Sequence, residues 1–164
     1  METFSYFCRM IVIDTETGQS HRVEIEPVES GDFKTITKKR YFFDWKEENE
    51  FELYKLRIVD TNDILGLVSC ERIPEEWRVH IRLLTVSQEN RGTDKKYENI
   101  AGNLITFISK IAVKEYGELA CVSLKPKEVI AQHYIAKYGM NITGMTLSVE
   151  IKEILNLIKT YDHD

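Results

Sequence analysis

The sequence contains few of the residues that define disulfide-rich or Pro/Gly-rich proteins. Its 164 residues include only three cysteines, three prolines and eight glycines. The cysteines, Cys8, Cys70 and Cys121, are odd in number, widely spaced and form no C-x-x-C pair, so no disulfide framework is indicated. Each lies among apolar residues, which predicts buried free thiols in a reducing cytoplasm. The histidines show no metal-ligand spacing, and we expect no metal site.

Long apolar runs and an excess of positive charge are also missing. No run of about 18 apolar residues is present, so we expect no membrane-spanning helix. The first apolar stretch contains Glu2, Arg9 and Asp14, which does not fit a signal peptide. The net charge is −5, whereas nucleic-acid binding needs a basic surface. We therefore expect a cytoplasmic protein without a membrane or nucleic-acid partner.

What is present is the composition of an ordinary globular domain. The sequence is 43% hydrophobic and 30% charged, and it has neither an internal repeat nor a Pro/Gly-rich linker. We predict a single domain over residues 1–164. Alternating or continuous apolar patterns bounded by turn residues predict strands in its first half. These strands are predicted at 4–13, 19–26, 51–60, 64–73 and 77–87.

The second half alternates between helix and strand. Residues 97–116 carry one apolar stripe at helical spacing, and Gly117 follows as a C-cap. Residues 119–124 form a short apolar strand, so the segment predicts a parallel β-α-β crossover. A helix from Pro126 to Gly139, a strand at 145–151 that could be a sheet edge, and a C-terminal helix complete the chain. The fold class is α/β (α+β), with a mixed, mostly antiparallel twisted sheet and one parallel β-α-β crossover.

Residues 31–50 carry no clear periodicity, but they contain the aromatic and basic stretch from Lys38 to Trp45. Such a stretch could form a stacking platform for nucleic acid. Given the negative net charge, we expect instead that the rings cover the sheet and that the lysines face solvent.

The segment 81–104, IRLLTVSQENRGTDKKYENIAGNL, carries the first local signature. It resembles the part of the GNAT superfamily of acyl-CoA-dependent N-acyltransferases in which a strand ending L-x-V runs through an R-G turn into a phosphate-binding loop and its helix. Leu84-Thr85-Val86 matches the strand end, and Arg91-Gly92 matches the turn. The order of predicted elements is also that of the GNAT fold.

The family loop, Q/R-x-x-G-x-G/A, aligns with residues 96–101. Lys96 takes the Gln/Arg place, Asn99 replaces the middle glycine and Ala101 takes the last place. Residues 93–95 lengthen the loop. Independently of the family, a loop that opens a helix leaves N–H groups unpaired, and together with Lys95 and Lys96 these favour an anion such as the pyrophosphate of coenzyme A.

A second signature is AQHYIAKYGM at residues 131–140. It resembles the GNAT segment A-x-x-F-Y-E-K-L-G-F through Ala131, Lys137 and Gly139. The catalytic tyrosine of the family falls on Ile135 in this register, and on Tyr134 if the passage contains one added residue. The resemblance covers roughly residues 50–150.

The resemblance implies acetyl transfer from acetyl-CoA to a primary amine of a small molecule or a peptide. His80 stands where many GNAT proteins have a glutamate base, and Tyr134 is the candidate acid. Glu71 and Glu75 are reserve carboxylates, and a backbone N–H near Leu84 would stabilise the oxyanion. The implied cofactor-binding residues are Leu84, Thr85, Val86, Arg91, Gly92, Lys95, Lys96, Tyr97, Ala101, Gly102 and Asn103.

Two alternatives remain open. One is a binding or regulatory protein that keeps the fold without catalysis. The other is a GNAT-type toxin acting on aminoacyl-tRNA, for which the basic cluster at residues 38–40 is the only support. The sequence is compatible with a monomer or a homodimer.

Overall fold

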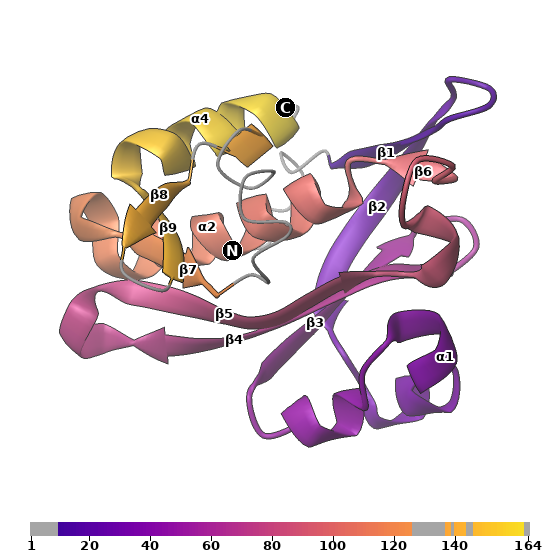
Figure 1. The fold of residues 1–164 in the computed structure, drawn as a ribbon, viewed down its shortest axis with the longest axis horizontal. Helices are drawn as coiled ribbons and strands as arrows, with labels where there is room; N and C mark the ends of the chain where they lie inside the picture. Colours follow the sequence, from indigo (N-terminus) through magenta and orange to yellow (C-terminus); the bar gives the residue numbers. More distant parts are fainter. Residues whose placement is uncertain (1–9, 126–136, 139, 144–145, 163–164) are drawn as a thin grey trace.

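A twisted mixed sheet runs through the computed structural model, which describes residues 10–125, 137–138, 140–143 and 146–162 (Figure 1). In these residues the strand order is β6-β1-β2-β3-β4-β5-β7-β9-β8. The pairs are antiparallel except β5 and β7, which are parallel. The strands are β1 (Ile11–Asp14), β2 (Ser20–Pro27), β3 (Glu52–Ile58), β4 (Ile64–Ile73), β5 (Arg78–Val86), β6 (Tyr97–Glu98), β7 (Cys121–Leu124), β8 (Asn141–Thr143) and β9 (Thr146–Glu150).

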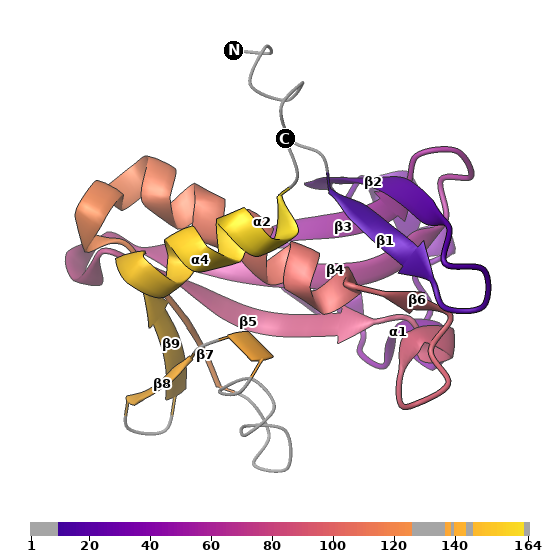
Figure 2. The same cartoon turned by 90° about the horizontal axis from the view of Figure 1, so that it is seen from above.

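Two helices cover one face of the sheet. α2 (Ile100–Tyr116) and α4 (Ile151–Tyr161) lie next to each other on that face (Figure 2). In the apolar stripe of α2, Leu104, Ile105 and Ile108 are completely buried in the core. α2 ends where predicted, because Gly117 has φ +59°, a positive φ that glycine adopts easily. The same helix therefore closes the predicted parallel crossover between β5 and β7.

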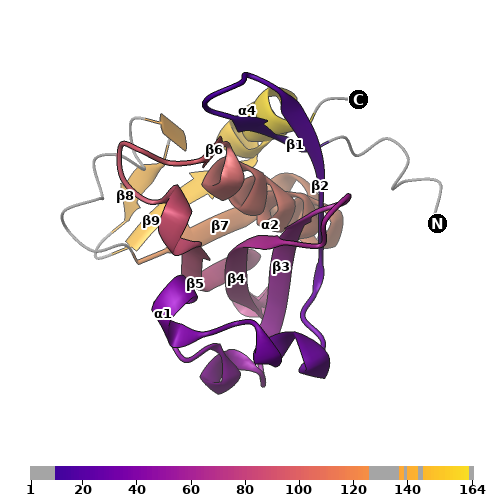
Figure 3. The same ribbon diagram turned by 90° about the vertical axis from the view of Figure 1, so that its right-hand side faces the viewer.

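The segment between β2 and β3 covers the opposite face (Figure 3). It contains the 3-10 turns η2 (Ser30–Lys34) and η3 (Trp45–Glu48) and the short helix α1 (Lys38–Tyr41). Tyr41 is 0% exposed and Trp45 is 1% exposed, and both pack on β3 and β4. We call residues 30–49 the cover segment. The rings of Phe33, Tyr41, Phe43 and Trp45 cover the sheet and Lys38 and Lys39 are exposed, as predicted, whereas Phe42 contacts Arg91. Tyr41 and Trp45 are too deeply buried to stack on nucleic-acid bases.

The predicted strands of the first half are present wherever the structure describes them, and β4 matches its prediction at both ends. Residues 64–70 are buried on both faces, which explains their continuous apolar run. Cys70 is a free, buried thiol as predicted, and burial raises its pKa to about 12. Cys121 is free but only half-buried, and Cys8 lies outside the described residues.

Two sequence predictions need correction, and two strands were missed. The strand at 145–151 is not an edge, because β9 pairs with β7 on one side and with β8 on the other. The helix predicted from residue 97 begins at Ile100, because residues 97–98 pair with β1 instead. β6 and β8 were not predicted at all. The helix predicted from Pro126 to Gly139 lies outside the described residues apart from Lys137 and Tyr138, which are helical.

Two properties of the described residues limit the kinds of site. None of their helices is both long and apolar enough to cross a lipid bilayer. In the same residues, no three His, Cys, Asp or Glu side chains are grouped so that they could hold a metal ion.

Candidate active site

The parallel strands β5 and β7 separate partway along β5. They pair from Arg78 with Cys121 to Ile81 with Leu124, and β5 then continues to Val86 without a partner strand on that side among the described residues. A register shift in the pairing with β4 leaves Arg82 as a bulge at the point of separation. Bulges bend a strand and increase its twist. The bulge therefore marks the start of a gap beside residues 82–86.

The backbone groups that face this gap follow from the antiparallel ladder with β4. The Ser87 N–H donates to the Leu65 carbonyl at 2.8 Å, so Ser87 points toward β4. Because direction alternates along a strand, the backbone groups of Leu84 and Val86 point the other way, into the gap. The Thr85 hydroxyl donates to the Val86 carbonyl at 3.0 Å. Because they point away from β4, the N–H groups of Leu84 and Val86 are donors along the gap.

His80 lies just before the bulge, on the sheet face opposite α2. Its Nδ1 is 2.8 Å from the Ser123 hydroxyl, to which Arg78 Nη1 also donates at 2.7 Å. Partial burial, followed by the positive charge of Arg78, lowers the pKa of His80, and Glu71 opposes this effect. The imidazole is therefore neutral at pH 7. A hydroxyl oxygen can accept two hydrogen bonds, so Ser123 can accept from Nδ1–H and leave Nε2 unprotonated.

One carboxylate is beside His80, and a second lies further along the same face. Glu71 is the direct partner of His80 on β4, and Glu48 accepts hydrogen bonds from Ser69 at 2.8 Å and from Arg82 at 2.9 Å. Burial opposes ionisation of Glu48, but the hydrogen bonds from Arg82 and Ser69 outweigh it, and the pKa is lowered. The face near His80 therefore presents charges of both signs. Glu75 is exposed in the β4–β5 turn.

The loop from Ser87 to Asn99 connects the end of β5 to α2, and we call it the connecting loop. Two of its residues have left-handed backbone conformations, Gly92 with φ +80° and Asn99 with φ +78°. Asn99 stands where the GNAT motif has its middle glycine, and asparagine is among the non-glycine residues that best tolerate this region. The loop keeps the glycine-like backbone conformation without the glycine.

The predicted cofactor-binding residues of the connecting loop contact neighbouring segments. The Arg91 guanidinium lies 4.2 Å from the centre of the Phe42 ring and is exposed. The carbonyls of Lys95 and Lys96 accept from Thr15, in the turn after β1. The Tyr97 N–H donates to the Asn90 side chain at 2.8 Å. The connecting loop is thus fixed to the β1–β2 hairpin just before the helix begins.

The first turn of α2 combines unpaired N–H groups with positive charge. Asn99 occupies the N-cap, but its side chain makes no capping hydrogen bond, so the first N–H groups have no acceptor within the helix. Burial, followed by the positive charge of Lys95, lowers the pKa of Lys137, with Glu98 opposing. Lys95 and Lys137 therefore lie near each other at this end. The arrangement favours an anion.

Three predicted residues within α2 differ in exposure. Ala101 is half-buried at the start of the helix. Gly102 is buried against the ring of Tyr161 in α4, and the Asn103 side chain donates to the Ile11 carbonyl at 2.7 Å. Both therefore have packing roles that the sequence did not indicate. Tyr134 lies outside the described residues.

The gap and the helix start lie at the same end of β5. A Cβ atom added to Gly66 of β4 would be 2.8 Å from Ile100 Cγ2 and 3.0 Å from the Thr85 carbonyl oxygen. The first residue of α2 is therefore packed directly on β4 and the end of β5. Leu84, Val86 and the helix N-terminus are brought together, and His80 precedes them on β5. Ser123, which orients His80, was not predicted as a site residue. The only feature of the sequence that indicates it is that it is a single serine within the apolar run 119–124.

Comparison with known proteins gives matches only in three dimensions. No protein-family model matches, and neither does any curated protein sequence. A spermidine N-acetyltransferase chimera of Vibrio cholerae SpeG and hSSAT superposes with a TM-score of 0.61 and 14% identity, over 82% of this chain and 98% of that chain. The Escherichia coli ribosomal-protein-S18-alanine N-acetyltransferase gives 0.58 and 11%, over 79% and 94%. A GNAT family acetyltransferase from Elizabethkingia anophelis with acetyl-CoA bound gives 0.58 and 14%, over 79% and 98%.

Proposed function

Starting from the GNAT fold that this chain has, we propose that it is an N-acetyltransferase that moves an acetyl group from acetyl-CoA to a primary amine. The observation that carries the proposal is the gap beside β5. There the N–H groups of Leu84 and Val86 face away from β4, and the N-terminus of α2 lies at the same end. Backbone donors leading to an anion site suit a long ligand with amide groups and phosphates.

The residues present suit acetyl-CoA chemically. Leu84 and Val86 would hold its amide-containing arm through their backbone. The first-turn N–H groups of α2, with Lys95 and Lys96 and with Lys137 nearby, would hold its phosphates. The remaining predicted contacts, such as Arg91 and Ala101, stay part of the proposal. Bound acetyl-CoA supplies an activated acyl thioester for the transfer.

His80 would prepare the acceptor amine. Alkylamines have a pKa near ~10 and are protonated at neutral pH, so a base must remove a proton before the nitrogen can attack. A neutral imidazole with Nε2 free can accept that proton directly or through water. The Leu84 N–H would stabilise the negative oxygen of the tetrahedral intermediate. Tyr134 remains the candidate acid for the leaving thiolate.

The acceptor is proposed only as a class, a small molecule or a peptide with a primary amine. The spermidine and ribosomal-protein enzymes above show that this fold serves both kinds in other proteins. Glu71 on β4 would favour a cationic amine near His80. Of the basic cluster behind the tRNA alternative, Arg40 is ion-paired with Asp63 and Glu89, whereas Lys38 and Lys39 are exposed.

Calorimetric titration with acetyl-CoA tests the cofactor site. Wild type should bind, and the Lys95→Glu/Lys96→Glu double variant should lose most of that affinity. The Lys152→Glu/Lys159→Glu variant makes the same charge change on the exposed face of α4, so it should bind normally. Equal loss in both double variants would show a non-specific charge effect and contradict the site.

Thiol release from acetyl-CoA across a panel of amines tests catalysis. Turnover that is strongly reduced in His80→Ala would support the base role. Acetyl-CoA binding without turnover on any amine would favour the alternative of a non-catalytic binding protein with this fold.

A further inference from the structure

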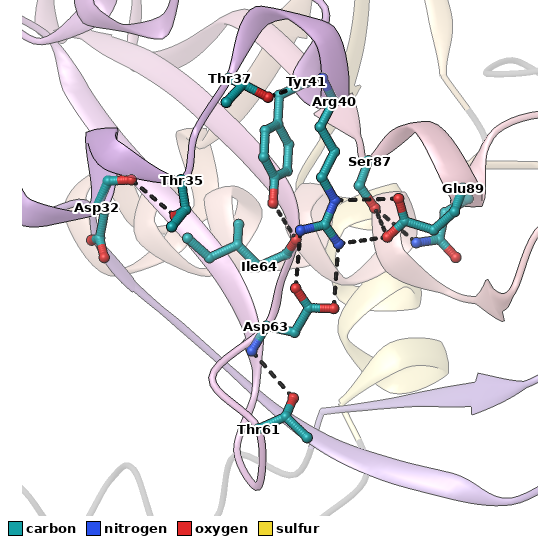
Figure 4. A network of polar contacts seen from close by, with 11 residues as sticks. Asp32, Thr35, Thr37, Arg40, Tyr41, Thr61, Asp63, Ile64, Ser87 and Glu89 are labelled. Carbon is teal, nitrogen blue, oxygen red and sulfur yellow. Dashed lines mark hydrogen bonds and ion pairs between the residues drawn. The ribbon is translucent and has the colours of Figure 1, made fainter.

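A polar network joins the cover segment to the connecting loop (Figure 4). Arg40 of α1 donates through Nε and Nη2 to Glu89, at 3.2 and 2.6 Å, and through Nη1 and Nη2 to Asp63, at 3.0 and 3.3 Å. Both contacts are bidentate, which gives strong and directional hydrogen bonds. Asp63 belongs to the β3–β4 turn and Glu89 to the connecting loop. Arg40 therefore bridges a turn of the sheet and the loop.

Arg40 is itself held firmly. The next residue, Tyr41, is completely buried, and its hydroxyl donates to the Ile64 carbonyl at 2.7 Å. The Thr37 side chain caps α1 by accepting from the Arg40 N–H at 3.3 Å. The guanidinium thus starts from a fixed backbone on the sheet face opposite α2.

The network continues from Glu89 toward α2. Glu89 Oε2 accepts from the buried Ser87 hydroxyl at 2.9 Å, and Asn90 Nδ2 donates to the same hydroxyl at 2.9 Å. The Asn90 side-chain oxygen then accepts from the Tyr97 N–H at 2.8 Å, and the Glu89 carbonyl accepts from the Lys96 N–H at 3.2 Å. An unbroken series of contacts therefore runs from Arg40 to Lys96 and Tyr97.

Glu89 keeps its negative charge over the physiological pH range, so the ion pairs with Arg40 persist. Burial opposes ionisation of Glu89, but the hydrogen bonds from Arg40, its own backbone and Ser87 lower its pKa to about 2. Glu89 is therefore ionised at every pH at which the protein would be assayed. The carboxylates of Asp63 and Glu89 both bind the one guanidinium of Arg40. Removal of Arg40 therefore leaves two negative charges close together without a cation between them.

We infer that Arg40 is a positioning residue that fixes the connecting loop in the shape that holds the cofactor phosphates. The affinity for coenzyme A thereby depends on the cover segment, on the other side of the sheet from α2. The cofactor part of this inference rests on the proposed function. The mechanical part, from Arg40 to residues 95–97, stands on the contacts alone.

Hydrogen exchange of the unliganded protein and calorimetry with coenzyme A test the two parts separately. In Arg40→Ala, peptides covering residues 95–98 should exchange about fivefold faster, and coenzyme A should bind about fivefold more weakly, a change of about 1 kcal/mol. Arg40→Lys should lie between Arg40→Ala and wild type, because an ammonium cannot make two bidentate contacts. In an acetyl-transfer assay, KM for acetyl-CoA should rise while kcat stays unchanged.

Arg57→Ala is the matched control. Arg57 is ion-paired with Glu24 at 2.6 Å and Glu26 at 3.2 Å, on β2, and donates to the Asn62 side chain at 2.9 Å. None of these three partners belongs to the connecting loop. Arg57→Ala should leave both measurements at wild-type values. If Arg40→Ala prevents folding, Glu89→Gln removes the charge while keeping the side-chain shape and should give the same changes at reduced size.

The outcomes separate the inference from the proposed function. Unchanged exchange of residues 95–98 in both Arg40→Ala and Glu89→Gln would overturn the inference, as would equal effects in Arg57→Ala. Faster exchange in a protein whose wild type does not bind coenzyme A would support the mechanical coupling, and it would overturn both the proposed function and the cofactor part of the inference.

Discussion

The contact between Gly102 and Tyr161 offers a sharp test of how α2 and α4 pack. A Cβ atom at position 102 would lie 2.4 Å from Cε1 and 2.5 Å from Cζ of the Tyr161 ring. These separations are shorter than carbon atoms tolerate, so either the ring or α4 must move. Tyr161, the last residue of α4, is only 9% exposed, so its ring has little free space to move into. The variant to make is Gly102→Ala.

Two opposing contributions set the size of the effect. Overpacking a well-filled core costs about 1–3 kcal/mol, and alanine is favoured over glycine inside a helix by about 1 kcal/mol. Gly102→Ala should therefore lower the free energy of unfolding by about 0–2 kcal/mol, the difference of these two values. In a Tyr161→Leu background the two nearest ring atoms are absent. The same substitution should then raise stability by about 1 kcal/mol, so its sign reverses.

Urea unfolding followed by tryptophan fluorescence measures all four proteins of this cycle, and equal slopes would confirm that the same surface is exposed in each. A coupling of about 1–3 kcal/mol between the two positions is expected. Independent, additive effects would refute the packing explanation. If Gly102 is instead a glycine because the cofactor approaches it, Gly102→Ala should weaken acetyl-CoA binding equally in both backgrounds.

Three further predictions address the site and the cover segment. With His80 as the base, activity falls as the pH drops through its lowered pKa, so kcat/KM should stay level until the pH is below 6.5. Arg78→Gln removes a repelling positive charge, so the loss of activity at low pH should begin at a higher pH. An unchanged pH profile in this variant would contradict the assignment. Tyr41→Phe leaves a buried β4 carbonyl unpaired and should cost about 1–2 kcal/mol in urea unfolding, whereas Tyr116→Phe, whose hydroxyl has no partner in the described residues, should cost much less. Asn99→Val should destabilise by about 1–2 kcal/mol because of the left-handed backbone, and Asn99→Gly should not; equal effects would contradict the strain argument.

Elements with strong local patterns could be predicted from the sequence. Residues 64–73 form a central strand whose first seven residues are buried on both faces, and the apolar run alone identifies it. The stripe of α2 and Gly117, with its positive φ, define the end of the helix in the same local way. The parallel crossover followed from the order strand, helix, strand, because parallel neighbours need a crossover connection and a helix usually supplies it.

The start of α2 could not be predicted in the same way. Tyr97 and Glu98 fit a helical pattern, but they pair with Asp14 and Ile13 on β1. Backbone pairing with a distant strand overrides local propensity, which is worth only a few tenths of a kcal/mol per residue. The strand at 145–151 was expected as a possible edge because its second neighbour, β8, consists of only three residues and has no pattern of its own.

Some features of the candidate site follow from local sequence patterns, and others depend on tertiary contacts. The sequence by itself determined the order of the longer strands and of α2, the strand end at Leu84 to Val86, the lysines before α2 and the histidine on β5, because each is a local pattern of residue types. Only the tertiary structure decided that β5 separates from β7 after Ile81. It also decided that Arg40 holds Glu89, 49 residues away in the chain. Contacts of this kind depend on where the sheet brings distant segments together, and no local pattern of residues records them.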